Sequence, residues 1–292
     1  MTDKCRMCPR KCLRDRNVEK GFCGADSNVR IARVGLHMWE EPCISYGKGS
    51  GTVFFSGCSL KCVFCQNHEI SAGGKGRDIS SKDLPELFME VKRMGAVNLN
   101  LVNPTHYSLD IARALYKVKE NLGIPVIFNT GSYDRVETLK ELSGLVDIYL
   151  PDIKYFSSEY SEKYSGARDY FKVAFSAIEE MFRQTGYPMF DNEGHMVSGV
   201  LPRHLVLPTL YRDSMAILDE LCAKYDVSKL HISIMRQYFP THRACEYPEL
   251  SRKLTTLEYN KVIEYAEKLG IVNGYSQEKS SAKEEYVPDF DF

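Results

Sequence analysis

The sequence predicts an α/β fold, a partial or open barrel of six strand–helix units preceded by a small cysteine-rich module. From about residue 50 onward, strand-like apolar runs alternate with amphipathic helical segments, which predicts a parallel sheet with right-handed crossovers. The second observation is that four of the ten cysteines fall in the first 23 residues. We therefore expect a metal-binding module over 1–45, the barrel over 46–276 and a tail over 277–292.

Each expected element is a short segment bounded by turn residues. The helix over 81–94 begins at Ser81 and stops at Gly95, and the next stops at Gly123. Asn192-Glu193-Gly194 predicts a hairpin turn inserted before the fifth strand. The tail is polar with an aromatic end, which fits either a loose tail or a strap over the barrel. The expected strands are 52–55, 96–102, 125–128, 146–150, 204–207 and 230–235, and the expected helices are 81–94, 109–122, 135–142, 170–184, 213–225 and 257–269.

Charge and hydropathy exclude several classes of partner. The chain has 38 basic and 39 acidic side chains, a net charge of -1, so neither nucleic acid nor a membrane is expected as a bulk partner. The residues after Met1 are polar, and no uninterrupted apolar run approaches the roughly 18 residues of a membrane span. We expect a cytoplasmic protein, and cysteines bunched in a reducing compartment indicate metal or redox chemistry.

One cysteine motif carries the chemistry. Cys58, Cys62 and Cys65 form C-x3-C-x2-C directly after the first expected strand. Three such thiolates can bind three irons of a cubane cluster. No fourth cysteine follows at ferredoxin spacing, so one iron stays open to bind a substrate. The alternatives are a structural zinc knuckle or three buried thiols, although zinc normally takes paired C-x2-C units.

This motif, with Phe64 immediately before the third cysteine, resembles the signature of the radical S-adenosylmethionine (SAM) superfamily. The resemblance implies a partial (β/α)6 radical SAM barrel with a [4Fe-4S] cluster whose open iron chelates SAM. In that family an electron from the cluster cleaves SAM to a 5′-deoxyadenosyl radical, which abstracts hydrogen from a substrate. It also implies that Phe64 lies near the adenine and that flavodoxin or ferredoxin supplies the electron.

Residues 30–275 resemble the pyruvate formate-lyase activating-enzyme-like branch of that superfamily. Asn129-Thr130 resembles its Asp-Thr-Asn stretch, and Asp152 and Lys154 lie in a stretch that resembles its Leu-Asp-Ile-Lys. The resemblance implies that these residues contact SAM and help to hold a monovalent cation. Arg203 resembles an arginine that hydrogen-bonds SAM. Asp152 and Lys154 could instead form a plain salt bridge at a strand end.

Two places depart from the pattern of this branch. Where its members have Gly-Gly-Glu, this chain has a stretch ending in Asn103-Pro104-Thr105-His106. Asn103 and Thr105 could accept the same hydrogen bonds from the SAM amino group, and His106 either caps the following helix or acts in catalysis. The sixth strand ends without the usual Tyr-His, and Tyr238 there either shapes the substrate pocket or is a packed aromatic.

Cys5, Cys8, Cys12 and Cys23 form C-x2-C-x3-C-x10-C. Four thiolates with tight turns predict a closed second site, either structural zinc or an auxiliary [4Fe-4S] cluster. The alternative is four unliganded thiols. Nearby basic residues would offset the thiolate charge.

The leading functional hypothesis is a radical SAM enzyme. Its substrate is either a glycine in a partner protein, as for a glycyl-radical-enzyme activase, or a small molecule, and a hairpin and tail that narrow the barrel mouth would favour the latter. The alternative is an iron–sulfur electron-transfer or sensing protein that does not cleave SAM.

Overall fold

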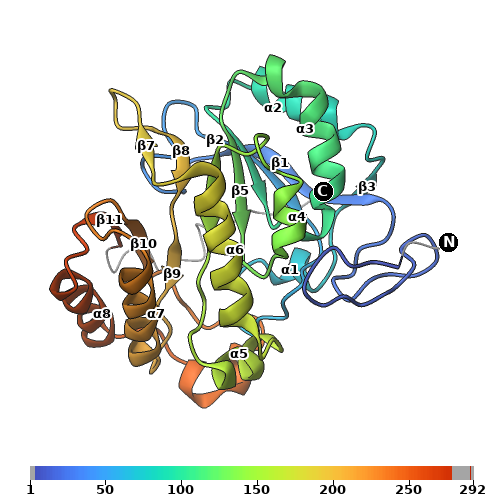
Figure 1. Cartoon of the computed structure of the whole chain (residues 1–292). Coiled ribbons are helices and arrows are strands. Elements are labelled where there is room, and N and C mark those ends of the chain that lie inside the picture. Colours follow the sequence, from blue (N-terminus) through green and yellow to red (C-terminus); the bar gives the residue numbers. More distant parts are fainter. Residues whose placement is uncertain (1–3, 278–289, 291–292) are drawn as a thin grey trace.

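The computed structural model describes residues 4–277 and Phe290, and in these residues the chain has the expected α/β fold (Figure 1). The predicted tail, apart from Gln277 and Phe290, lies outside the described residues.

The strands form two hydrogen-bonded sheets. The larger has the order β3-β1-β2-β4-β5-β6-β8-β7, and the smaller has the order β11-β10-β9. Pairing is parallel from β2 through β4, β5 and β6 to β8, and parallel throughout the smaller sheet. The strands are β1 (Val29–His37), β2 (Ser50–Phe55), β3 (Arg77–Ile79), β4 (Leu99–Val102), β5 (Val126–Thr130), β6 (Ile148–Pro151), β7 (Met189–Phe190), β8 (Met196–Val200), β9 (Arg203–Leu205), β10 (His231–Met235) and β11 (Asn273–Ser276).

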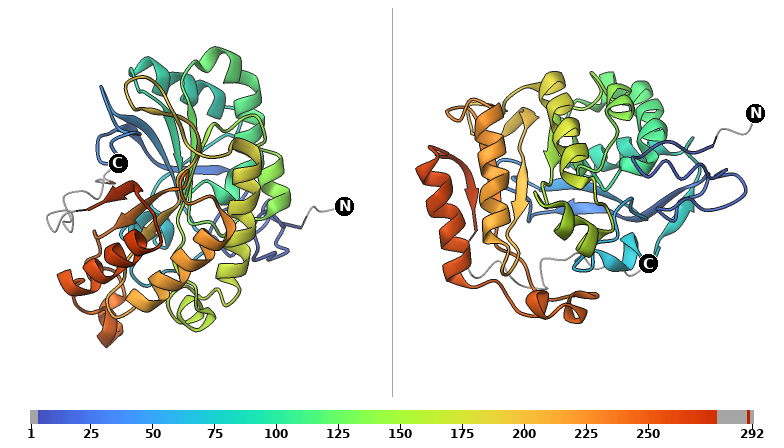
Figure 2. Two further views of the ribbon diagram at one scale, coloured as in Figure 1. Left: turned by 60° about the vertical axis from the view of Figure 1, so that its left-hand side comes forward. Right: turned by 60° about the horizontal axis from the view of Figure 1, so that its bottom comes forward.

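The longer helices flank the strands on their outer side, as the views in Figure 2 show. Leu99 and Leu101 of β4 share one core cluster with Phe88 and Ile111 of the adjacent helices. Asn100, between those leucines, points to the opposite side because successive strand residues alternate in direction. The α-helices are α1 (His68–Ser71), α2 (Leu84–Arg93), α3 (Ser108–Leu122), α4 (Val136–Lys140), α5 (Ser158–Ser165), α6 (Tyr170–Thr185), α7 (Tyr211–Lys224) and α8 (Thr256–Lys268); the 3-10 helices are η1 (Thr105–Tyr107), η2 (Ala244–Glu246) and η3 (Pro248–Leu250).

Each of the six expected strands corresponds to an observed one, and β7 and β8 form the expected hairpin, but β1, β3 and β11 were not expected as strands. β1 lies in the segment predicted as a separate module, yet it pairs antiparallel with β2. The expected hairpin is present: β7 and β8 pair antiparallel, and Gly194 N donates to Asp191 O at 3.1 Å in the turn. None of the helices in the described part of the chain is long and apolar enough to cross a membrane.

The two sheets meet at the carboxyl end of β6. The first part of β6 pairs with β8, whereas Asp152, just beyond β6, forms an isolated parallel bridge with Arg203 of β9. Pro202 stands between β8 and β9, and because proline has no N–H it interrupts the ladder there. Asp152 and Arg203 are thereby brought together at the junction, on the side that bears the functional pocket.

Candidate functional site

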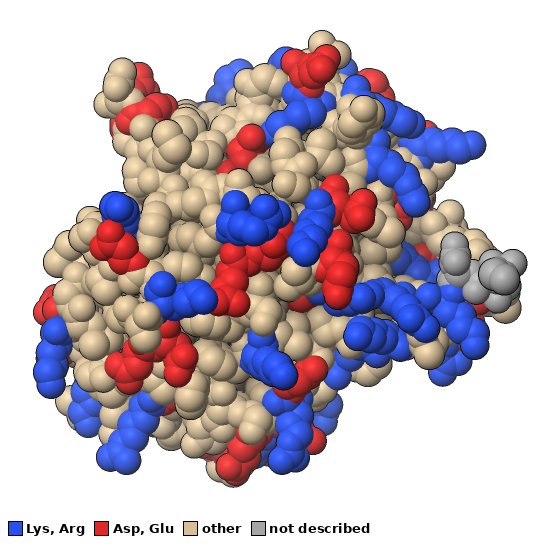
Figure 3. All heavy atoms as spheres, in the orientation of Figure 1, with Lys and Arg blue, Asp and Glu red and all other residues tan. Residues whose placement is uncertain are grey.

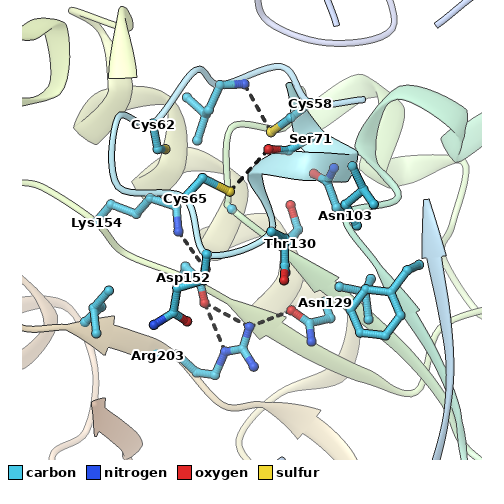
Figure 4. Close-up of a pocket in the computed structure, with 18 of the residues that line it drawn as sticks. Cys58, Cys62, Cys65, Ser71, Asn103, Asn129, Thr130, Asp152, Lys154 and Arg203 are labelled. Carbon is cyan, nitrogen blue, oxygen red and sulfur yellow. Dashed lines mark hydrogen bonds and ion pairs between the residues drawn. The ribbon is translucent and has the colours of Figure 1, made fainter. Parts of the chain in front are cut away.

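A pocket at the carboxyl ends of the parallel strands collects most of the sequence-predicted site residues (Figure 4). Within the described chain, one candidate from the barrel, Thr105, does not line this pocket. The four amino-terminal cysteines do not line it either. The candidates that do line it are Cys58, Cys62, Phe64, Cys65, Asn103, Asn129, Thr130, Asp152, Lys154 and Arg203.

The loop after β2 presents all three cysteines of the C-x3-C-x2-C motif to one wall of the pocket. Each thiol has a polar partner: Leu60 N donates to Cys58 Sγ at 3.4 Å, Ser165 Oγ donates to Cys62 Sγ at 2.9 Å, and Cys65 Sγ lies 3.2 Å from Ser71 Oγ. Hydrogen bonds of this kind orient ligands before a metal arrives.

Two thiols of this wall, those of Cys58 and Cys65, have raised pKa values that favour the protonated form. Burial, reinforced by Cys62 and Cys65, raises the pKa of Cys58 to about 12, and burial likewise raises the pKa of Cys65. Lys154 acts in the opposite direction on both groups, because its positive charge favours the thiolate. Loading a metal centre must therefore release protons, and Lys154 is placed to compensate the thiolate charge left behind.

The three thiols match the donor chemistry of an iron–sulfur cluster. Among residues 4–277 and Phe290, no three Cys, His, Asp or Glu side chains are already grouped so that they could hold one metal ion. A cubane makes a different demand, because each thiolate binds its own iron. Three thiols on one pocket wall fit that demand, and the cluster assignment rests on this donor chemistry.

The floor of the pocket is a network of charges. Arg203 contacts Asp152 at 2.9 Å and Glu40 at 3.1 Å, and it donates to Asn129 Oδ1 at 2.5 Å. Lys154 contacts the second oxygen of Asp152 at 2.7 Å. Burial opposes ionisation of Asp152, but Lys154 and Arg203 outweigh it and lower the pKa of this carboxyl. The predicted Asp152–Lys154 salt bridge is thus present, and it also lines the pocket.

The segment after β4 is held against the cysteine loop. Asn103 has a φ of 57° and its side-chain amide donates to Gly57 O. Thr105, in contrast, turns away from the pocket lining: its hydroxyl lies 3.2 Å from that of Thr130, which donates to Asp134 Oδ2 at 2.6 Å. Burial raises the pKa of Asp134 to about 6, although the hydrogen bonds from Thr130 and Thr105 act to lower it.

His106 does not have the capping role considered for it. It does not cap the following helix, because its Nε2 lies 2.7 Å from Ser56 O, at the end of β2. Burial lowers the pKa of His106 to about 4, although the hydrogen bond to Ser56 acts in the opposite direction. The ring is therefore neutral and donates to the Ser56 carbonyl. His106 therefore supports the start of the cysteine loop from behind and does not line the pocket.

Phe64 and Tyr238 belong to one aromatic cluster. Tyr238 is buried, donates from its hydroxyl to Leu250 O at 2.5 Å, and meets the ring of Phe64 edge to face with centroids 6.1 Å apart. Of the two alternatives for Tyr238, the packed aromatic is the one observed. Phe64 itself lines the pocket.

Sequence reasoning missed the side chains that β1 and its following loop bring to the pocket. Glu40 accepts from Asn100 Nδ2 at 3.0 Å and faces Arg203, while His37 and Trp39 line the wall beside it. No motif marks these residues. The strand itself could have been found from the apolar residues of Val29–His37, but its pairing with β2 is a tertiary contact.

The amino-terminal cysteines gather in a compact turn region next to the cysteine loop. A Cβ added at Gly21 would lie 3.5 Å from Cys23 Sγ and 3.6 Å from Cys12 Sγ. Burial raises the pKa of Cys8 to about 12, and the charges of Cys23, Cys5 and Cys12 add to that effect. In the described residues the four thiols are not grouped closely enough to hold a single metal ion.

Comparison with known proteins shows the family of this chain. A family model described as the radical SAM superfamily matches residues 52–192. The uncharacterized protein MJ0674 of Methanocaldococcus jannaschii is 32% identical over 275 residues, covering 91% of this chain and 75% of that protein. The chain therefore belongs to the radical SAM superfamily, which implies iron–sulfur and SAM binding.

One solved structure shares the fold of this chain. A mutant of spore photoproduct lyase superposes with a TM-score of 0.51 at 12% identity, covering 76% of this chain and 74% of that one. The crystal structure of Streptococcus suis SuiB bound to S-adenosylmethionine gives a TM-score of 0.49 at 16% identity; it matches 76% of this chain, which spans only 45% of SuiB.

Proposed function

We propose that this protein is an enzyme that holds a [4Fe-4S] cluster on Cys58, Cys62 and Cys65 and binds SAM in the adjoining pocket. The observation that carries the proposal is the arrangement of three half-buried thiols on one wall of a pocket whose floor is charged. When bound, the cluster supplies the electron that cleaves SAM to a 5′-deoxyadenosyl radical. The two sheets around the pocket would serve as one partial six-unit barrel.

The chain's own residues would bind and orient SAM. SAM carries a carboxylate, an amino group and an adenine, and the pocket offers a partner for each: Lys154 and Arg203 are cationic, Asn103 and Thr130 offer side-chain oxygens, and Phe64 offers an aromatic surface. Thr105 would act through Thr130, whose hydroxyl it contacts.

A monovalent cation near Asn129, Thr130 and Asp152 stays a prediction. Both carboxylate oxygens of Asp152 already face Lys154 and Arg203, so a cation there would have to share the carboxylate with these side chains.

For the substrate, we favour a small molecule over a glycine of a partner protein. Phe290 is buried against Phe54, with their ring centroids 5.5 Å apart, and its cluster includes Ile70. Phe54 and Ile70 both line the pocket, so Phe290 braces the pocket wall from behind and limits how far it could open for a peptide loop. The hairpin contributes nothing of the kind, since no residue of β7 or β8 lines the pocket. A glycyl-radical activase of the pyruvate formate-lyase activating-enzyme-like branch is the alternative.

The second site would be a closed module on Cys5, Cys8, Cys12 and Cys23, with zinc and an auxiliary [4Fe-4S] cluster as the two candidate occupants. Either is compatible with four thiolates. A reducing cytoplasmic location would suit both sites.

The test is anaerobic reconstitution with iron and sulfide, followed by dithionite, SAM and an assay for 5′-deoxyadenosine. We expect product from the intact protein, and a variant with Cys58, Cys62 and Cys65 changed to alanine should give none and lose about four irons per chain. Iron left in that variant would identify the second site as a cluster, and zinc would identify it as structural. A well-loaded protein in which SAM perturbs no property of the cluster would support the electron-transfer or sensing alternative instead.

A further inference from the structure

The amino-terminal segment is strongly basic in a chain that is otherwise balanced. Residues 4–20 contain seven Lys or Arg and two Asp or Glu, against a net charge of -1 for the whole chain. The side chains of Lys4, Arg6, Lys11 and Lys20 are exposed. In Figure 3 the blue side chains gather on the flank of the molecule beside the grey amino-terminal atoms. This flank therefore presents a positive face to solvent.

The same segment is bonded directly to the loop that carries the cluster cysteines. Cys58 N donates to Cys23 O at 3.0 Å, and Arg10 Nε donates to Ser59 O at 2.8 Å. Gly57, the residue before Cys58, approaches so closely that an added Cβ would lie 2.5 Å from Cys23 O. The amino-terminal segment that carries the positive face is thus in contact, through Arg10 and Cys23, with the backbone of the metal-binding loop.

Lys61 extends the basic face to a place where Cys62 can be reached from outside. Its ammonium lies 5.4 Å from the ring centroid of Phe22, in the amino-terminal segment, and its side chain also lines a small hollow with His242 and Arg243. Cys62 lines this hollow as well as the SAM-side pocket. The motif therefore has an inner side, for ligands, and an outer side bordered by basic residues.

We infer that the basic face formed by Lys4, Arg6, Lys11, Lys20 and Lys61 is the docking surface for an acidic protein that donates one electron to the cluster. The inference rests on the proposed function. The donor protein loses one electron and the cluster gains it, with no bond made or broken. Approach from the outer side leaves the pocket to SAM and substrate, and opposite charges steer an acidic donor to this face.

The experiment measures binding of oxidised flavodoxin, an acidic donor protein, to the reconstituted enzyme by titration calorimetry at low and physiological salt. The test variant carries Lys4→Glu, Lys11→Glu and Lys20→Glu. The matched control carries Lys117→Glu, Lys172→Glu and Lys268→Glu, three lysines on α3, α6 and α8. We expect the test variant to bind roughly tenfold or more weakly and to lose most of its salt dependence, because steering by this face is electrostatic. The control should change far less.

A second measurement separates docking from redox function. Reduced methyl viologen is a small cation that needs no docking face, so both variants should be reduced by it at the wild-type rate, while reduction by flavodoxin hydroquinone should slow only in the test variant. Equal loss of flavodoxin binding in both variants, or no loss in the test variant, would overturn the inference. A test variant that keeps its affinity for flavodoxin but no longer binds an RNA hairpin would also overturn it, because the basic face would then serve RNA. If viologen reduces the cluster but SAM is not cleaved, the proposed function fails while the docking result still stands.

Discussion

Gly57 precedes the cysteine loop, lies against the amino-terminal segment and has an unusual backbone conformation. Its φ of 91° is in the region that side chains rarely adopt, and an added Cβ would lie 2.5 Å from Cys23 O and 3.2 Å from His106 Nε2. Only glycine lets the chain turn from β2 into the cysteine loop while Cys58 N bonds to Cys23 O.

We therefore expect Gly57→Ala to lower the free energy of unfolding by about 2–4 kcal/mol, combining backbone strain with a steric clash, and to reduce the iron retained after reconstitution. The control is Gly144→Ala, since Gly144 has a φ of 77° and no atom within 4 Å of an added Cβ. It should show the strain alone, about 1 kcal/mol, with full iron content. Denaturant titration and iron analysis measure both, and equal effects of the two substitutions would refute the role given to the clash.

At the scale of elements, local patterns predicted the parallel strands and their helices because each has a strong apolar signal and a clear stop. Gly123, for example, ends α3 in the left-handed conformation with a φ of 64°, as its position predicted. β1 and β11 depend instead on pairing partners far along the chain, and β11 has the weakly apolar sequence NGYS. Tertiary pairing, which a local pattern does not contain, decides such edge strands.

The contact between β9 and α7 gives a pH-dependent prediction. His204 is buried, with Nδ1 lying 2.6 Å from Ile153 O and Nε2 lying 2.7 Å from Ser214 Oγ. Burial, against the Ile153 bond, lowers the pKa of His204 to about 4, so the folded protein keeps the ring neutral. Between this value and the ordinary histidine pKa of about 6.5, the unfolded chain binds more protons, so stability falls as the pH falls.

His204→Gln removes this titration. We expect wild type to lose about 2–3 kcal/mol more unfolding free energy than the variant between pH 7 and pH 4.5. Other buried groups that titrate there, such as Asp134, act equally in both proteins and cancel in the comparison. Urea titrations at the two pH values give the difference, and parallel losses in the two proteins would show that His204 is not held neutral.

At the scale of the whole molecule, the sequence was most informative where the functional residues lie close together along the chain. Cys58, Cys62 and Cys65 share one loop, so their spacing alone predicted a common site. Asn129 and Asp152 could be predicted to lie close together, because they stand at the carboxyl ends of neighbouring strands expected to be parallel. Arg203 opens β9 and reaches them because β9 pairs with the chain just beyond the end of β6. The contribution of Glu40 could not be predicted, since it depends on how the segment after β1 folds back across the pocket to reach Arg203.

The central claim is that the three-cysteine cluster leaves one iron free to bind SAM. Its most direct test is electron paramagnetic resonance of the dithionite-reduced protein, with electron–nuclear double resonance on SAM labelled with 15N in its amino group and 17O in its carboxylate. The variant with Cys5, Cys8, Cys12 and Cys23 changed to alanine isolates the cluster in question. We predict that SAM shifts the spectrum and that both labels couple to the cluster. An unchanged spectrum from a fully loaded cluster, with no coupling to either label, would contradict the account.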